Sequence, residues 1–405
     1  MATKKKKQST KKLSFRKTSP LKILLAVVVV TAVAGIGTYL LTRSNAATAG
    51  GFHTCQVRVS DKTLWCWGAN ESGQLGTGDN INRNVPTKVN IAGVASVSAG
   101  SYHTCATKTD GTLWCWGSNG AGQLGIGLTL TTNTSSHPDK NVPTQLYIAG
   151  VASVSAGNGH TCATKTDGTL WCWGWNSDGE LGIGNTTGKF VPTQLYIAGV
   201  ASVSTGNGHT CARKTDGTLW CWGLNISGQL GIGNTTGKFV PTKVNIAGVA
   251  SVSTGNGHTC ATRTDGTLWC WGLNSDGVLG IGNTTGKFVP TKVNIAGVAS
   301  VSAGTYHTCA KKTDGTLWCW GNNDYGELGI GTQGVTTNKN VPTQLYIAGV
   351  ASVSAGSYHT CATKTDGTLW CWGLNDRGQL GIGNATNPNS YPNKNVPTQL
   401  YFIWK

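Results

Sequence analysis

One tripeptide constrains the fold of this chain more than any other feature. His-Thr-Cys occurs seven times, at His53, His103, His160, His209, His258, His307 and His359, with steps of 49 to 57 residues. Each copy precedes a Trp-Cys-Trp-Gly segment, and each unit contains several short strand patterns. A repeat of this length made of β-segments is typical of a propeller or a solenoid, in which each unit packs only on its neighbours.

The second unit shows how many strands a repeat contains. Residues 94–100, 103–108, 112–116 and 142–148 read as strands, and Thr-Asp-Gly at 109–111 reads as a turn. Four strands per unit is one propeller blade. The 58 glycines and the low fraction of charged residues, 12%, fit a turn-rich all-β protein. The sequence therefore predicts an all-β fold, a seven-bladed β-propeller of about 50-residue four-stranded repeats, preceded by an N-terminal apolar helix.

Cysteines occur in pairs, one pair in every unit. A three-residue Thr-Asp-Gly turn places Lys108 opposite Thr112, so alternate counting along both strands brings Cys105 opposite Cys115. The first unit spaces its cysteines one residue further apart, but its turn is also one residue longer. We therefore predict one disulfide within each blade: Cys55 with Cys66, Cys105 with Cys115, Cys162 with Cys172, Cys211 with Cys221, Cys260 with Cys270, Cys309 with Cys319, and Cys361 with Cys371.

The same alternation assigns side chains to the two faces of each blade. Leu113 and Cys115 point to one face, whereas Trp114 and Trp116 point to the other. We expect the tryptophan face of each blade to pack on the leucine and disulfide face of its neighbour. We also expect the ring to close with residues 398–403 near the hairpin of residues 52–67.

The N-terminus predicts export. Of the 32 Lys and Arg residues, ten precede residue 44, where no acidic residue occurs, and residues 23–41 form an apolar run. We predict a basic cytoplasmic tail at 1–22, a transmembrane signal-anchor or signal peptide at 23–42, and the propeller at 47–405. The protein is then extracytoplasmic: membrane-anchored with a cytoplasmic N-terminus, or secreted if cleaved near Ala46. Paired cysteines suit that oxidising location.

Three motifs of the repeat resemble a known family. Val-Ser-Ala-Gly-x-x-His-Thr at 97–104, Asp-Gly at 110–111 and Trp-Gly-x-Asn-x-x-Gly-Gln-Leu-Gly at 116–125 closely resemble the regulator-of-chromosome-condensation repeat. The resemblance covers all seven units and implies that family's seven-bladed propeller, here as an exported, disulfide-rich variant. It also implies guanine-nucleotide exchange, the family's founding activity. A secreted β-lactamase inhibitor with the same propeller implies a second possibility, binding to an enzyme.

Repeated polar residues suggest structural roles. The histidine of each His-Thr-Cys motif lies two positions before a paired cysteine, and the aspartates of the Asp-Gly turns bond their own backbone. No metal-ligand spacing, catalytic constellation, phosphate loop or cofactor motif stands apart from the repeat. The sequence therefore predicts a protein that is not an enzyme, with no cofactor and no metal. Because its basic residues beyond the N-terminus are scattered, we expect no specific nucleic-acid binding.

Variation among the units points to a binding surface, because binding usually depends on loops. The variable segments are 79–84, 128–141, 185–190, 234–239, 283–288, 332–340 and 384–395. In the third to fifth units, apolar and basic residues recur at equivalent positions and form a candidate partner-binding stripe: Trp175, Lys189, Phe190, Leu224, Lys238, Phe239, Leu273, Lys287 and Phe288. Packing of the Phe rings over a blade edge is the alternative role.

These observations predict a binding or recognition scaffold whose variable rim loops contact a protein or cell-surface ligand. The sequence also leaves open an inhibitor or regulator of an exported enzyme, and the nucleotide exchange that the resemblance implies. Membrane contact would come through the N-terminal helix if it is not cleaved.

Overall fold

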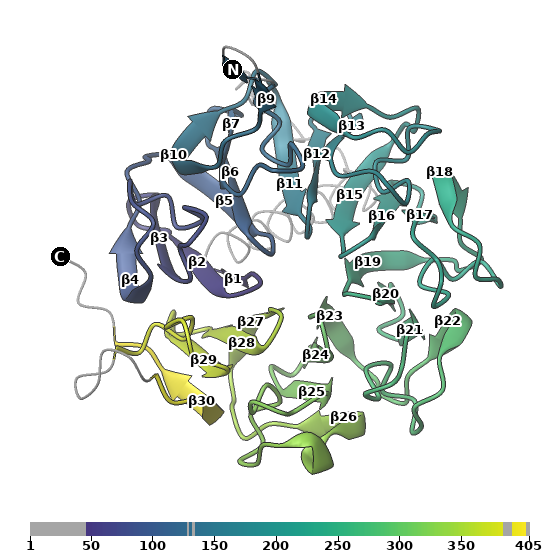
Figure 1. Cartoon of the computed structure of the whole chain (residues 1–405). Helices are drawn as coiled ribbons and strands as arrows, with labels where there is room; N and C mark the ends of the chain where they lie inside the picture. The colour runs from purple at the N-terminus through teal and green to yellow at the C-terminus, as the bar shows by residue number, and fades with distance from the viewer. Residues whose placement is uncertain (1–45, 128, 132–133, 384–390, 402–405) are drawn as a thin grey trace, which may run out of the picture. The chain divides into compact units, whose positions relative to one another are not determined.

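A computed structural model of the protein describes residues 46–127, 129–131, 134–383 and 391–401. Seven four-stranded antiparallel sheets form a ring of blades, which confirms the predicted propeller (Figure 1). The predicted basic tail and apolar segment, residues 1–42, lie outside the described residues. Within the part of the chain that is described, no helix has the length and apolar character needed to cross a membrane.

Each blade is one continuous stretch of chain, with its strands in sequence order from the channel outward. The innermost strands are β1 Ala47–Ala49, β5 Val94–Ala99, β11 Val151–Ala156, β15 Val200–Thr205, β19 Val249–Thr254, β23 Val298–Ala303 and β27 Val350–Ala355. The second strands are β2 His53–Arg58, β6 His103–Lys108, β12 His160–Lys165, β16 His209–Lys214, β20 His258–Arg263, β24 His307–Lys312 and β28 His359–Lys364.

The third strands are β3 Thr63–Gly68, β7 Leu113–Gly117, β13 Leu170–Gly174, β17 Leu219–Gly223, β21 Leu268–Gly272, β25 Leu317–Gly321 and β29 Leu369–Gly373. The outermost strands are β4 Arg83–Lys88, β10 Lys140–Gln145, β14 Lys189–Gln194, β18 Lys238–Lys243, β22 Lys287–Lys292, β26 Lys339–Gln344 and β30 Lys394–Gln399. A small hairpin, β8 Thr129–Thr131 and β9 Thr134–Ser136, and a 3₁₀ turn, η1 Val335–Thr337, lie in two of the loops before the outermost strands.

The predicted disulfide register is confirmed in every blade. Lys108 donates its backbone N–H to the carbonyl of Thr112, and Gly111 adopts a φ of 79° that favours glycine. Cys105 then faces Cys115 across β6 and β7. The longer turn of the first blade keeps Cys55 opposite Cys66. All seven predicted disulfides are present, with Cα atoms 4.1 to 4.2 Å apart.

The outermost strands differ slightly from their predicted bounds. In the second blade the strand begins at Lys140, opposite Gly117, and ends at Gln145, whereas the sequence predicted residues 142–148. The register shifts between Lys140 and Thr144. Pro143 lies within that shift, and because proline has no N–H to give to a ladder, it fits only at such an irregular outer strand.

The predicted packing of faces is also confirmed. Trp116 of the second blade packs in one buried cluster with Leu64 and the Cys55–Cys66 disulfide of the first. The same arrangement recurs at the other blade interfaces. Each interface thus buries one large indole against one leucine and one disulfide, and these side chains form the core.

The ring closes between the seventh and first blades by packing, without exchange of a strand. Trp65 and Trp67 share a buried cluster with Leu369, the Cys361–Cys371 disulfide and Leu400, which follows β30. Leu400 lies in the segment that the sequence placed near the hairpin of residues 52–67, in agreement with that prediction. The short strand β1 completes the first blade as its innermost strand.

Candidate functional site

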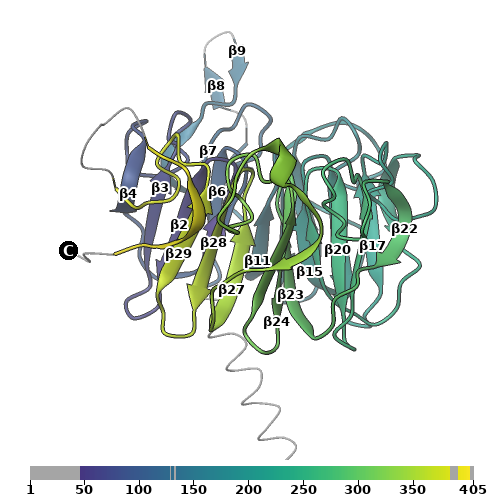
Figure 2. The same ribbon diagram turned by 90° about the horizontal axis from the view of Figure 1, so that it is seen from below.

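The two faces of the propeller carry different turns. The Gly-x-x-His turns between the first and second strands lie at the same end of each blade as the loops between the third and fourth strands. His103, at the start of β6, faces Gly117, at the end of β7. The β8–β9 hairpin projects from this face (Figure 2). The Asp-Gly turns lie at the opposite end. We call the first face the loop face and the second the turn face.

A cavity of about 320 Å³ opens where the seven Gly-x-x-His turns meet, and we call it the channel mouth. Every blade contributes to its lining. The first variable residue of each turn is small or polar, namely Gly51, Ser101, Asn158, Asn207, Asn256, Thr305 and Ser357. Among the described residues that line the cavity, none has a charged side chain and none is histidine.

Aromatic side chains line one side of the channel mouth. Phe52 lies between Tyr102 and Tyr358, with ring centroids 6.3 and 5.7 Å away. Tyr358 in turn lies 5.4 Å from Tyr306, and the ring of Tyr325 packs edge-on against it. Burial, together with a hydrogen bond to Tyr306, raises the pKa of Tyr358 to about 12, so this phenol stays neutral. Tyr102 remains 46% exposed.

The remaining side of the mouth belongs to the third to fifth blades, where glycine replaces the aromatic residue of the turn. The side chains of Trp175, Leu224 and Leu273 occupy the space beside these three glycines. A Cβ added to them would lie within 3.1 to 3.3 Å of those side chains; the glycines are Gly159, Gly208 and Gly257. The indole N–H of Trp175 donates to Ser177 Oγ at 2.6 Å. A large apolar side chain therefore stands near the mouth in every blade.

Two sets of hydrogen bonds hold the backbone around the channel. In all seven interfaces, a Ser or Thr hydroxyl of one innermost strand accepts the backbone N–H of the next, as Ser98 Oγ does from Ala156 at 3.0 Å. At the turns of six interfaces, a backbone N–H also donates to a glycine carbonyl of the following blade, as Ser101 does to Gly157 at 3.1 Å. Ser357 donates to Gly50 in the same way at 3.2 Å, between the seventh and first blades.

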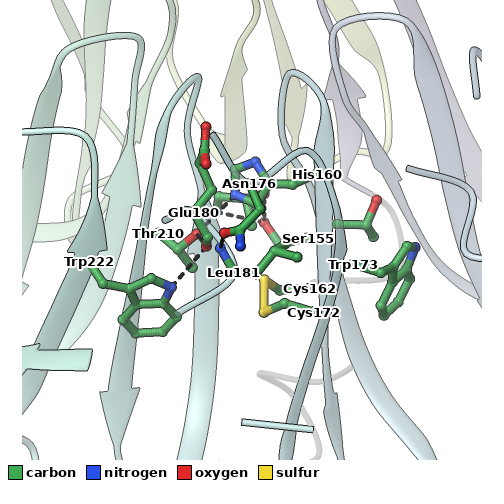
Figure 3. The surroundings of a disulfide bond; sticks show 12 residues. Ser155, His160, Cys162, Cys172, Trp173, Asn176, Glu180, Leu181, Thr210 and Trp222 are labelled. Carbon is green, nitrogen blue, oxygen red and sulfur yellow. Dashed lines mark hydrogen bonds between the residues drawn. A yellow bond between two sulfur atoms is a disulfide. The ribbon is translucent and has the colours of Figure 1, made fainter. Parts of the chain in front are cut away.

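The seven histidines form the next ring outward. His160 Nε2 lies 2.9 Å from Thr210 Oγ1, whose hydroxyl donates to the carbonyl of Glu180 at 2.8 Å (Figure 3). Since the hydroxyl proton is directed to the carbonyl, the imidazole donates from Nε2. Trp222 Nε1 donates to the same carbonyl at 2.9 Å. Equivalent His–Thr bonds join all seven interfaces, including His359 with Thr54.

Burial keeps these imidazoles neutral. It lowers the pKa of His160 to about 3 and that of His103 to about 4. The turn aspartates also act on their own backbone: Asp110 Oδ1 accepts from the N–H of Thr112 at 3.0 Å and from its hydroxyl at 2.6 Å. Both residue types thus have the structural roles that the sequence indicated. No group of three or more potential metal ligands occurs among the described residues.

The residues of the predicted partner-binding stripe have two kinds of neighbour in the structure. Trp175, Leu224 and Leu273 adjoin the turns of the channel mouth, as described above. Phe190, Phe239 and Phe288 lie on the outermost strands, over glycines of the preceding blade: Gly122, Gly179 and Gly228. Asparagine takes this place over the equivalent glycines of the other blades. Phe239 and Phe288 still expose nearly half of their surface, so a binding role for this set stays a prediction.

Lys189, Lys238 and Lys287 begin the same outermost strands as these Phe residues. Part of the variable segments, residues 128, 132–133 and 384–390, lies outside the described residues. The rim that the sequence predicted from these segments is therefore described only in part.

Sequence reasoning missed the channel mouth. The signal was present, because the two positions between Gly and His-Thr vary inside an otherwise constant repeat. A second signal accompanies it: where the second of these positions is glycine, the residue after Trp-Gly is Trp175, Leu224 or Leu273, although the seventh unit combines Tyr358 with Leu374. In the other six units the two positions vary together, as two side chains that share one space do.

Known proteins resemble this chain in sequence over part of its length. Two Arabidopsis thaliana proteins, the RCC1 domain-containing mitochondrial protein RUG3 and the ultraviolet-B receptor UVR8, are 30% and 31% identical over 142 and 143 residues. Each alignment covers 34% of this chain, and the chain spans only 30% and 31% of these curated relatives.

Solved structures resemble it over most of its length. Yeast RCC1 (Prp20), solved bound to Kap60, matches with a TM-score of 0.75 at 20% identity, over 99% of this chain and 92% of that one. Human WBSCR16 matches with a TM-score of 0.70 at 24% identity, over 79% and 86%. At these identities the likeness establishes the fold.

Family models describe the repeats directly. The model of the regulator of chromosome condensation (RCC1) repeat matches residues 61–107, and a second model of that repeat matches residues 46–74 and 94–123. The model of the RCC1-like domain matches residues 135–403, more than half of the chain. The chain therefore belongs to the RCC1-like domain family of seven-bladed propellers.

Proposed function

We propose that this protein is an extracytoplasmic recognition scaffold, which binds a protein or cell-surface ligand on its loop face. RCC1-like propellers are a family of protein-binding and regulatory scaffolds. The observation that carries the proposal is the channel mouth, a cavity on the axis of a rigid ring, with aromatic side chains from four blades around it. Concave sites lined by aromatic and a few polar groups are the usual form of binding sites.

Two features support an extracytoplasmic location. All fourteen cysteines are paired in disulfides, which persist in oxidising compartments. The apolar run at 23–41 is long enough for a membrane anchor.

A photo-crosslinking experiment on intact cells tests this proposal. A photoreactive amino acid replaces Tyr102 on the loop face or, as a matched control, the fully exposed Tyr147 on the turn face. We expect specific crosslinks to a surface component from position 102 and few from position 147. Equal labelling from both positions would contradict binding on the loop face. A propeller that stays undigested when protease is added to intact cells would contradict the extracytoplasmic location.

A further inference from the structure

The channel mouth has the chemistry of a site for an uncharged polar ligand. Its lining consists of Gly, Ala, Ser, Thr, Asn, Phe and Tyr residues, so no side chain offers a charge to pair with a phosphate, a carboxylate or an ammonium group. Nucleotides, acidic peptides and basic peptides would each bury a charge there without a partner, which is costly. The lining therefore favours a neutral ligand.

Polar groups on one side of the mouth both donate and accept hydrogen bonds. Asn207 Nδ2 donates to Asn256 Oδ1 at 2.6 Å, and Asn158 stands exposed beside them. Across the ring, Thr305 Oγ1 donates to Ser357 Oγ at 2.9 Å. Amides and hydroxyls combine donors and acceptors in one group. They match a ligand whose own groups are hydroxyls, which likewise donate and accept.

The aromatic side supplies the complementary contact. The rings of Phe52, Tyr102, Tyr306 and Tyr358 border the cavity, and Tyr102 keeps nearly half of its surface open to solvent. A neutral ligand that carries both hydroxyl groups and a flat face of C–H groups can use both sides of the mouth. Its hydroxyls can hydrogen-bond to the asparagines, and its C–H face can stack on these rings. A pyranose ring has this combination, whereas a purely apolar ligand would leave the asparagines unsatisfied.

We propose that the channel mouth binds an uncharged saccharide, such as the end of a cell-surface glycan. This proposal rests on the recognition role proposed above and names the ligand class of the same site. The cavity of about 320 Å³ accepts the terminal sugars of a chain and leaves the remainder outside. Hydrogen bonds between the innermost strands at all seven interfaces fix the position of the turns before a ligand arrives, which reduces the entropic cost of binding.

Binding to defined oligosaccharides tests the proposal. The purified, oxidised propeller is applied to an array of uncharged gluco-, manno-, galacto- and N-acetylglucosamine oligomers with sialylated and sulfated counterparts, and hits are measured by calorimetry. We expect binding to neutral oligomers, weakened about tenfold by Tyr102→Ala and by Asn207→Ala. Tyr102→Phe keeps the ring and should retain most of the binding. Tyr147→Ala, on the turn face, should leave it unchanged. Thermal unfolding of each variant confirms that it is folded.

Two results would overturn the saccharide site. One is the absence of binding to every neutral oligomer; the other is binding that Tyr102→Ala and Asn207→Ala both leave intact. Crosslinking from position 102 shows whether only the saccharide proposal fails or the recognition role fails as well. If surface crosslinks persist after glycosidase treatment of the cells, the partner is a protein and the recognition role stands. If no crosslink forms at all, the recognition role fails as well.

Discussion

At the scale of single residues, two buried glutamates stand where other blades use a neutral residue. Glu180 and Glu327 occupy the position of Gln74, Gln123, Gln229 and Gln379, and are at most 1% exposed. Their backbone carbonyls accept the same Thr and Trp hydrogen bonds as the glutamine carbonyls do. Burial raises the pKa of both carboxyl groups to about 7. The backbone carbonyl thus forms the link between blades, so this position accepts either Gln or Glu as its side chain.

These carboxyl groups give stability a dependence on pH. The unfolded chain releases their protons near pH 4.5, whereas the folded protein holds them until about pH 7. The contribution of these two groups to the free energy of unfolding is therefore greatest below pH 4.5, and it falls as the pH rises to about 7. We expect Glu180→Gln with Glu327→Gln to stabilise the protein by roughly 1–3 kcal/mol per site at pH 8 and hardly at all at pH 4.5. Thermal unfolding at both pH values measures this. An equal gain at the two pH values would contradict the assigned pKa shifts.

At the scale of elements, the hairpin of the second and third strands is the unit that each disulfide stabilises. All fourteen cysteines are at most 1% exposed, and each bridge closes a loop of 10 or 11 residues. The turn already sets the register of the two strands. The disulfide therefore stabilises the hairpin mainly by reducing the conformational entropy of the unfolded chain. The Trp of the next blade covers each bridge, which links hairpin stability to blade packing.

Removal of one bridge should therefore cost a moderate and similar amount in any blade. We expect Cys211→Ala with Cys221→Ala to lower the free energy of unfolding by about 2–4 kcal/mol. Denaturant titration of oxidised protein measures the loss, and the same pair of changes at Cys260 and Cys270 serves as the matched comparison. In the wild-type protein, a thiol reagent with reductant should label few cysteines until denaturant is added. Rapid labelling of the native protein would contradict the burial of the bridges.

At the scale of the whole molecule, the interface between the seventh and first blades closes the ring. It contains the same links as the internal interfaces: His359 with Thr54 at 2.8 Å, and Thr54 and Trp67 with the carbonyl of Gln379. Ala49 N–H also donates to Ser354 Oγ at 2.9 Å. Since no described strand of one of these two blades pairs with the other, side-chain packing and hydrogen bonds between the blades close the ring.

The closing interface should therefore be as sensitive as an internal one. Thr54→Val removes the hydroxyl that links His359 to Gln379, and Thr210→Val removes its equivalent between the third and fourth blades. We expect each change to cost about 1–3 kcal/mol, because a buried imidazole N–H loses its acceptor. Unfolding in denaturant measures both. A neutral Thr54→Val beside a costly Thr210→Val would indicate that the ring is open in solution.

The number of blades, the order of their strands, the disulfide pairs and the faces that pack together could all be predicted from the amino-acid sequence. This was possible because these depend on turn length and on the two-residue period of a strand, both of which are local. Cys105 and Cys115, for example, are separated by one short turn. Pro143 was readable as an outer-strand residue, although the bulge that moved the start of the strand to Lys140 was not.

The cavity at the channel mouth, in contrast, follows from the tertiary fold. Phe52 and Tyr358 are more than three hundred positions apart in the chain, and nothing local to either brings their rings within 5.7 Å. The closed ring does so, because it directs seven equivalent turns at one axis. The same geometry gives Trp175 and Phe190, which the sequence had grouped by recurrence alone, different neighbours: Gly159 of the same blade and Gly122 of the preceding blade. Recurrence shows that positions are equivalent between blades, whereas contact between them depends on how the blades are arranged around the axis.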